Sequence, residues 1–300
     1  SKAEALRLRA ELLGKAHTGE LAPRSTEHLD SFALWWIRTA KAPHVRPATA
    51  GDYEARYRHS IAPVFGHRRI TDITSRDVAN WLYDMSQQGY SVTTINGARQ
   101  LLSMVLDGAI QFDHIRINPV KNVPKHKPTY TTHTTVKGAW GREEAITALQ
   151  AAKGTDVELP VALALVLGMR RSEILGLQWA DFDFEHGTLH IRRSRREARV
   201  FDADGTSHRQ LDTYATKNPS SARKLILGPL VTAALLAHRA RQDEHGHYSP
   251  TQWVMTSTTG TPLEPRRLNY LFDRFSRQNG IRKIRFHDLR HTSAQIALSG

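Results

Sequence analysis

Cysteine is absent from the 300 residues of this sequence. Its absence excludes disulfide bridges, thiolate ligands for metal ions and a cysteine nucleophile, and it fits the cytoplasmic location that we expect. Long apolar runs are absent as well. The longest, LPVALALVLGM at residues 159–169, is far shorter than the roughly 20 residues that span a bilayer. We therefore predict a buried core helix there, no secretory signal and no membrane partner.

Acidic residues are few relative to basic ones. Lysine and arginine number 42 against 29 aspartates and glutamates, which gives a net charge of +13 and an isoelectric point near 10.2. A basic excess of this size favours a polyanionic partner, with nucleic acid ahead of an anionic membrane. No basic amphipathic helix with a long apolar face stands out, so the membrane alternative is the weaker one.

Strand-like alternation is missing from residues 26–117. Apolar residues recur there at helical spacing. The pattern predicts four helices, at residues 27–40, 49–66, 76–89 and 91–112. Thr26 and Ser75 are candidate N-terminal caps for the first and third of them. We expect these residues to form a small helical bundle.

Periodicity is lost at residues 118–139, which are rich in proline, threonine and lysine and predict a basic linker. Helical patterns return over residues 140–300 and are interrupted by strand-like segments, two of which flank a turn at residues 217–220. The predicted fold is therefore mainly α with a small antiparallel sheet, built as a helical bundle followed by an α+β domain.

Two histidines and an arginine stand together in HDLRH at residues 287–291. Histidines at i and i+4 share a helix face, as in zinc proteases, but those enzymes have glutamate after the first histidine and this chain has Asp288. Arg290 would repel a cation, and no third ligand at suggestive spacing stands out among the 16 histidines. A guanidinium suits an anion such as phosphate better. We therefore expect no metal at this segment.

A second group of charges directly follows the apolar run. Arg170 and Arg171 must leave the core or be held by a partner. Glu173 is placed to hold the Arg170 guanidinium by a charge-assisted hydrogen bond. The residues alone leave another interpretation open, in which Arg170 is a surface arginine in an ordinary i,i+3 ion pair.

Taken together, three segments resemble the signatures of the tyrosine site-specific recombinases, the phage integrase family. They are LGMRRSEILGLQWADFD at residues 167–183, the turn that carries Lys217, and HDLRHT at residues 287–292. The order and spacing of the segments agree with the family as well. The resemblance covers residues 26–300 and implies a SAM-like core-binding domain at 26–117, followed after the linker by a catalytic domain at 140–300.

The resemblance also implies roles for single residues. Arg170 and Arg290 resemble the two catalytic arginines that hold the scissile phosphate. Lys217 resembles the lysine of the β-hairpin turn, which implies that it protonates the leaving 5′-oxygen, and His287 resembles the histidine that assists proton transfer around the attacking tyrosine.

Three further residues are expected to support these four. Glu173 resembles the acidic residue that orients the first arginine. Asp183 is a candidate for a second supporting acid, and His291 for packing or support next to the phosphate-binding residues. Each of these assignments comes from the position of the residue within a matched motif.

The implied reaction needs no cofactor, because a tyrosine attacks the phosphodiester and stores the bond as a 3′-phosphotyrosyl ester without ATP or metal. The implied partners are double-stranded DNA with an att-type core site, further copies of the chain in a homotetramer on synapsed DNA, and DNA-bending and directionality factors. The implied role is integration or excision of a mobile element in a bacterial host cell.

The nucleophile is the point where the sequence departs from the family. There the tyrosine follows the second arginine by several tens of residues, whereas all eight tyrosines of this sequence precede Arg290. We therefore expect a truncated integrase that binds DNA but does not cleave it. Residues 1–25 predict a helix and a link, which are either a plain terminal helix or the remnant of an arm-binding domain.

Basic residues outside the motifs predict further DNA contacts. One group lies on the expected hairpin arm IRRSRREARV and the other in the linker. The candidates are Arg192, Arg193, Arg195, Arg196, Lys121, Lys125 and Lys127. A solvated charge run is the alternative in each case.

Three rival functions stay open. A non-catalytic DNA-binding regulator on the same fold would lack a downstream tyrosine. A histidine-based metallohydrolase would need stoichiometric zinc and would lose activity with a chelator. A type IB topoisomerase would use related residues but would relax supercoils without exchanging strands.

The charge of the chain leads to a first prediction. Affinity for duplex DNA should fall steeply with added salt, by about 10³-fold or more between roughly 50 and 200 mM, because each neutralised phosphate releases counterions. Fluorescence anisotropy with a labelled duplex measures this dependence. A flat dependence would contradict the view that the basic residues bind the phosphate backbone.

Overall fold

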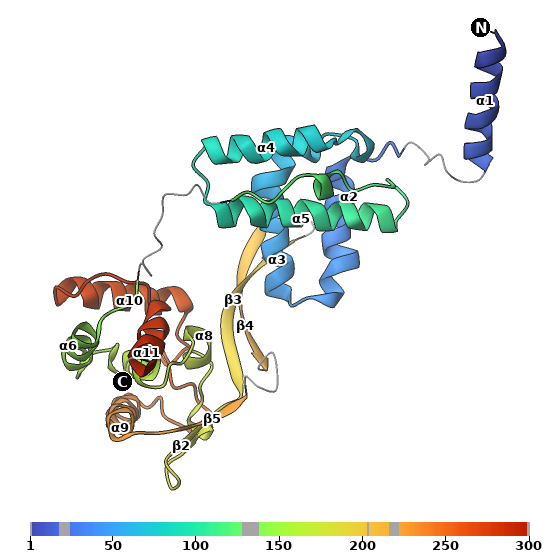
Figure 1. Cartoon of the computed structure of the whole chain (residues 1–300). Coiled ribbons are helices and arrows are strands. Elements are labelled where there is room, and N and C mark those ends of the chain that lie inside the picture. The colour runs from blue at the N-terminus through green and yellow to red at the C-terminus, as the bar shows by residue number, and fades with distance from the viewer. Residues whose placement is uncertain (1, 18–24, 128–137, 203, 216–221, 299–300) are drawn as a thin grey trace. The chain divides into compact units, whose positions relative to one another are not determined.

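The structure is a computed structural model that describes the chain except residues 1, 18–24, 128–137, 203, 216–221 and 299–300. The chain groups into two compact units (Figure 1). The first is Ser1–His133 with Ala198–His208, and the second is Thr134–Glu197 with Arg209–Gly300. The domain boundaries predicted from the sequence remain predictions, and the grouping by contacts adds residues 198–208 to the first unit.

The first unit contains the helical bundle that the sequence predicts. Its α-helices are α1 (Lys2–His17), α2 (Leu29–Trp35), α3 (Pro47–Arg56), α4 (Ser75–Gln87) and α5 (Val92–Gln111). π-Helical segments extend α2 and α3 over Trp36–Lys41 and Tyr57–Gly66, and short 3-10 helices lie at Ala42–His44, Ile70–Asp72 and Pro119–Asn122. The apolar stripes of α2 to α5 and the π segments meet in one core, in which Tyr57, Phe65 and Leu102 are fully buried.

Helix α4 begins one residue earlier than its predicted cap implies. Thr74, not Ser75, is the N-terminal cap: its hydroxyl accepts from the Asp77 backbone N–H at 3.3 Å, and the Asp77 carboxylate accepts from the Thr74 N–H at 2.8 Å. This reciprocal pair needs an acidic residue three positions after the cap, and only Thr74 has one. The Ser75 hydroxyl instead donates to the Pro119 carbonyl.

Residues 118–127, the first part of the predicted linker, are packed against α5. Asn118 is buried, and the Arg99 guanidinium donates to the carbonyl oxygens of Val120 and Val123. Asn96 exchanges two hydrogen bonds of 2.9 Å with the backbone of His126. Val120 and Val123 of this segment are buried in the apolar core. Its other contacts are polar and reach the backbone, so the segment shows no helical periodicity in the sequence.

The second unit is mainly helical as well. Its α-helices are α6 (Arg142–Ala152), α7 (Glu158–Val166), α8 (Arg171–Ile174), α9 (Pro229–Glu244), α10 (Pro265–Gln278) and α11 (Asp288–Leu298), with a 3-10 turn at Trp179–Asp181. The strands are β1 (Phe182–Asp183), β2 (Thr188–Ile191), β3 (Arg193–Phe201), β4 (Ser207–Ala215) and β5 (Arg223–Ile226). They belong to the second unit, except that residues 198–201 of β3 and 207–208 of β4 group with the first unit.

The strands form two small sheets where the sequence predicted one. β2 pairs antiparallel with both β1 and β5, with Leu189 opposite Phe182 on one side and Leu225 on the other. β3 pairs only with β4 in a separate sheet. The two segments that flank residues 216–221 therefore belong to different sheets and are not partners in one hairpin.

Helix α7 is the buried helix that the apolar run predicts. Every residue of 159–165 is buried, and the helix contacts α6, α9 and α11. The start of the unit is tied to α11, because the Trp140 N–H donates to the Thr292 hydroxyl at 2.9 Å. Among the described residues, no helix is both long and apolar enough to cross a membrane.

The tight packing of α5 leads to a second prediction. A methyl group at Gly108 would lie 2.3 Å from Nε1 of the buried Trp36, so Gly108→Ala should destabilise the first unit by about 1–3 kcal/mol through overpacking. Gly97→Ala in the same helix is the control: its methyl group would meet only the end of the Arg56 side chain, 3.3 Å away. That variant should be neutral or up to about 1 kcal/mol more stable, because alanine favours helix. Urea unfolding measures both, and equal stability of the two variants would contradict this packing.

Candidate phosphate-binding site

A buried carboxylate, that of Glu173, organises the site. Arg170 lies just before α8, and its backbone N–H donates to Glu173 Oε2 at 2.9 Å while its Nη1 donates to Oε1 at 2.8 Å. Arg223 of β5 donates from Nη1 to Oε1 at 3.1 Å and from Nη2 to Oε2 at 3.0 Å. The Glu173 side chain is only 4% exposed. The predicted i,i+3 pair is therefore a buried cluster that also contains a residue from β5.

Arg290 reaches the same region from α11. Its Nη1 donates to the carbonyl oxygen of Gly168, two residues before Arg170. Gly168 has a φ of +60°, a left-handed conformation that favours glycine, and a methyl group there would lie 3.3 Å from the Ser293 hydroxyl of α11. The loop after α7 thus holds Arg170 on one side and receives Arg290 on the other, so two arginines distant in sequence converge.

The charges of this cluster are coupled. Burial lowers the pKa of Arg290, and repulsion from Arg170 and Arg223 lowers it further, while Glu173 opposes the shift. Burial alone would raise the pKa of Glu173, but hydrogen bonds from Arg223 and Arg170 outweigh it and hold the carboxylate ionised. Three guanidiniums and one carboxylate leave a net charge of +2, which favours the binding of an anion such as a phosphodiester.

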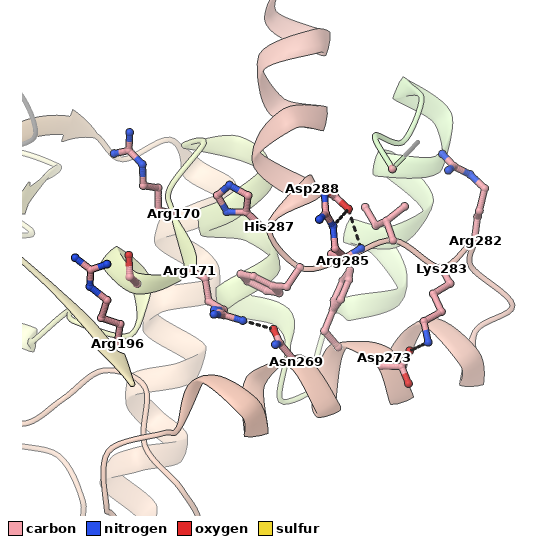
Figure 2. Close-up of a pocket in the computed structure, with 15 residues that line it drawn as sticks. Arg170, Arg171, Arg196, Asn269, Asp273, Arg282, Lys283, Arg285, His287 and Asp288 are labelled. Atoms are coloured by element: carbon pink, nitrogen blue, oxygen red, sulfur yellow. Dashed lines mark hydrogen bonds and ion pairs between the residues drawn. The ribbon is translucent and has the colours of Figure 1, made fainter. Parts of the chain in front are cut away.

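His287 lies beside Arg170 in an open cleft of about 960 Å³ (Figure 2). In Figure 2, Arg170 and Arg196 lie on one side of the view and Lys283 on the other, with His287 between them. The charged residues that line the cleft are mostly basic: Arg170, Arg171, Arg196, Arg282, Lys283 and Arg285 against Asp273 and Asp288. Such a surface suits an extended anion that carries several charges.

The two histidines of HDLRH are ring neighbours. The rings of His287 and His291 lie 5.5 Å apart, edge to face. Burial lowers the pKa of His287, and the charge of His291 lowers it further, while Asp288 opposes the shift. His287 is therefore neutral at pH 7 and can accept a proton.

Asp183, predicted as a second supporting acid, lies two residues from the buried Asp181, and its role stays a prediction. Asp183 is half-exposed and binds only its own turn, accepting from the backbone N–H of His186 at 3.0 Å and from its ring at 2.9 Å. Asp181 is buried and receives the Arg193 guanidinium on both oxygens, at 2.9 and 3.2 Å. Both residues lie in the matched motif, and only tertiary packing separates their roles.

The predicted hairpin arginines divide into two groups. Arg193 is engaged with Asp181, and Arg195 is 8% exposed with its guanidinium 4.6 Å from the Trp253 ring, so neither is presented to a ligand. Arg196 lines the cleft, and Arg192 is 58% exposed with only a 3.9 Å contact to Asp181. Arg193 and Arg195 lie two residues apart on β3 and so on one face of the strand, Arg196 lies on the other face, and Arg192 precedes the strand.

The remaining predicted contacts lie elsewhere. Lys121, Lys125 and Lys127 are exposed in the segment beside α5, where Lys121 also pairs with Asp107 at 2.8 Å. Lys217 lies outside the described residues. Over the part of the chain that is described, no three histidine, aspartate or glutamate side chains form a group that could hold a metal ion.

Sequence reasoning missed Arg223 and the Gly168 carbonyl. Arg223 stands in a β-prone segment, SARKLILG, where nothing in the local pattern distinguishes it from the neighbouring Lys224. The carbonyl of Gly168 is a backbone group, and its only sequence signal is a glycine directly after a buried helix.

Two family models match the chain. The model of the phage integrase family matches residues 143–298, and that of the phage integrase N-terminal SAM-like domain matches residues 29–86. The chain belongs to the phage integrase family. The catalytic-domain match includes the loop of Arg170, the strand of Arg223 and the α11 segment, so the family region contains the whole cluster around Glu173.

Relatives of the chain agree with this family assignment. A tyrosine recombinase XerC-like protein of Caldanaerobacter subterraneus subsp. tengcongensis is 25% identical over 88% of this chain and 70% of its own length. The chain spans 60 to 63% of the length of three integrase relatives. The family and these relatives support DNA breaking and rejoining by a tyrosine recombinase as the class of activity.

Solved structures share the fold. The Tn1549 transposon integrase in complex with transposon right end DNA has a TM-score of 0.69 at 19% identity, covering 91% of this chain and 88% of that one. The lambda integrase tetramer bound to a Holliday junction has a TM-score of 0.66 at 20% identity, covering 99% and 79%. The predicted fold class, mainly α with small antiparallel sheets, is confirmed.

The surroundings of His287 lead to a third prediction. In an NMR titration, His291→Gln should raise the pKa of His287, because it removes a repelling charge, and Asp288→Asn should lower it, because it removes an attracting one. Since the folded-state pKa is already depressed, the neutral imidazole persists to lower pH than in an exposed histidine. Shifts of the same sign in both variants would contradict the arrangement of these three side chains.

Proposed function

We propose that this chain is the DNA-binding and phosphate-binding part of a site-specific recombinase that cuts and rejoins duplex DNA through a 3′-phosphotyrosyl intermediate. The observation that carries the proposal is the convergence of Arg170 and Arg290, distant in sequence, on the loop after α7. A phosphodiester repels nucleophiles because it is an anion, and two guanidiniums at its non-bridging oxygens stabilise the more highly charged transition state.

The proton transfers are assigned to His287 and Lys217. A tyrosine hydroxyl attacks phosphorus, the P–O5′ bond breaks, and the 5′-oxygen leaves with a proton from Lys217. His287 is neutral at pH 7 and assists transfer of the tyrosine proton. The reverse attack by the 5′-hydroxyl of another strand rejoins DNA and releases the tyrosine. No tyrosine follows Arg290 in this sequence, so the proposal assigns the nucleophile to none of the 300 residues.

The partner proposed for the chain is double-stranded DNA with an att-type core site. The exposed Lys125 and Lys127 and the basic cleft support phosphate contacts by both units. Solved neighbours of the same fold are bound to DNA, and one is a tetramer on a Holliday junction. We extend both features to this chain: it acts as a tetramer on synapsed DNA in the bacterial cytoplasm, and it integrates or excises a mobile element.

A fourth prediction tests the mechanism. The protein expressed from the full gene should form covalent adducts with nicked core-site DNA in the presence of EDTA, detected as a shift on a denaturing gel. Arg290→Ala should abolish adducts while duplex affinity stays within a modest factor, because binding is spread over many phosphates. Arg241→Ala is a control: Arg241 lies on α9 and pairs with Glu158 at 3.6 Å, outside the cleft.

Other outcomes would contradict the proposal and point to a rival. Duplex binding without any adduct would favour a non-catalytic regulator. Loss of activity with EDTA would favour a metallohydrolase, and relaxation of supercoils without strand exchange would favour a type IB topoisomerase. A large loss of duplex affinity in Arg290→Ala would make this arginine a docking residue.

A further inference from the structure

Arg223 is the residue of the cluster that no sequence motif marks. It is the first residue of β5, opposite Ile191 of the central strand β2, so its backbone is fixed by the sheet. Both terminal nitrogens donate to Glu173, one to each carboxylate oxygen. This two-pronged arrangement fixes the orientation of a carboxylate more firmly than a single hydrogen bond does.

The Glu173 carboxylate has no acceptor capacity to spare. Each of its oxygens accepts one hydrogen bond from Arg223 and one from Arg170. Without Arg223, a carboxylate that is 4% exposed would lose half of its partners. A buried acceptor in that position turns toward the donor that remains, which here is Arg170.

Arg170 and Arg223 differ in exposure, and this difference indicates different roles. Arg170 uses one terminal nitrogen for Glu173, is 46% exposed and lines the cleft, so its other donors are available to a ligand. Arg223 is 26% exposed, is not among the residues that line the cleft, and uses both terminal nitrogens for Glu173. Arg223 therefore faces the carboxylate, and Arg170 faces the cleft.

Charge balance gives Arg223 a second effect. Glu173 and Arg170 alone sum to zero, so the carboxylate would cancel much of the field that Arg170 presents to an anion. Arg223 restores one positive charge to the cluster. Its influence extends to Arg290, whose pKa is lowered first by burial and then by repulsion from Arg170, with Arg223 adding to it.

The geometry points to Arg223 as a positioning residue for DNA cleavage, which holds the Glu173 carboxylate and through it keeps the Arg170 guanidinium oriented and free for the scissile phosphate. This role rests on the proposed function, because it concerns the same phosphate. It differs from the roles of Arg170 and Arg290 in that Arg223 acts through another side chain and does not itself touch the phosphate.

The test is single-turnover cleavage of nicked core-site DNA by the protein expressed from the full gene. Arg223→Gln should slow cleavage by about 10- to 100-fold, the effect of losing a charge-assisted pair of hydrogen bonds. Its duplex affinity should stay near that of the unsubstituted protein. Arg223→Lys keeps the charge and one donor and should recover part of the rate, whereas a purely structural role predicts no such rescue at temperatures where all variants are folded.

A double-mutant cycle separates positioning from direct phosphate contact. If Arg223 acts through Glu173, Arg223→Gln should change the rate by no more than about threefold in a Glu173→Gln background. If it touches the phosphate, the full loss should persist there. Arg241→Gln is the matched control, since it removes an arginine from a half-buried pair with Glu158 outside the cleft.

Each outcome either supports or overturns the positioning role of Arg223. Slow cleavage by Arg223→Gln, partial rescue by lysine and a small effect in the Glu173→Gln background support the inference. A normal rate for Arg223→Gln, an undiminished effect in that background, or an equal loss in Arg241→Gln overturns it while adduct formation still upholds the proposed function. An unsubstituted protein that forms no adduct overturns the proposed function and this inference with it.

Discussion

The hydrogen bonds to the Glu173 carboxylate are the interaction on which the candidate site depends. A carboxylate that is 4% exposed is stable as an ion only when its oxygens are fully paired, and here Arg170, just before α8, and Arg223 of β5 supply the pairing. The same bonds orient the Arg170 guanidinium, because Arg170 is held at both its backbone and its side chain. One buried charge thus joins the short helix, the sheet and the cleft.

Helix α7 brings Arg290 close to the group of side chains around Glu173. It is buried over residues 159–165, and the loop of Gly168 that follows it accepts a hydrogen bond from Arg290 of α11. Because α7 contacts α11 directly, the apolar core fixes the backbone positions from which the two arginines extend. The apolar run that a hydropathy reading marks only as core therefore supports the two arginines of the candidate phosphate-binding site.

The sequence predicted what local patterns encode, and tertiary contacts determined the rest. Helical periodicity located α4 and α5, the apolar run located α7, and the resemblance to the tyrosine recombinases implied that Arg170, Glu173 and Arg290 lie in one region. The sequence did not predict Arg223, because a β-prone segment with the adjacent basic residues Arg223 and Lys224 does not show which of them contacts Glu173. Asp181 and Asp183 lie two residues apart in the same motif, and the sequence does not show that Asp181 is the buried one. The packing of Asn118 and its neighbours on α5 combines polar contacts with two buried valines, Val120 and Val123, which are too few for a periodic signal.

The cap of α8 has an evolutionary consequence. The turn is closed by the Glu173 carboxylate and the backbone N–H of residue 170, a group that every amino acid except proline supplies. A substitution of Arg170 can therefore remove the guanidinium and leave the turn folded. A substitution of Glu173 also removes the carboxylate that Arg223 binds. A descendant of this protein can therefore keep the fold of this turn and lose one guanidinium of the candidate phosphate-binding site.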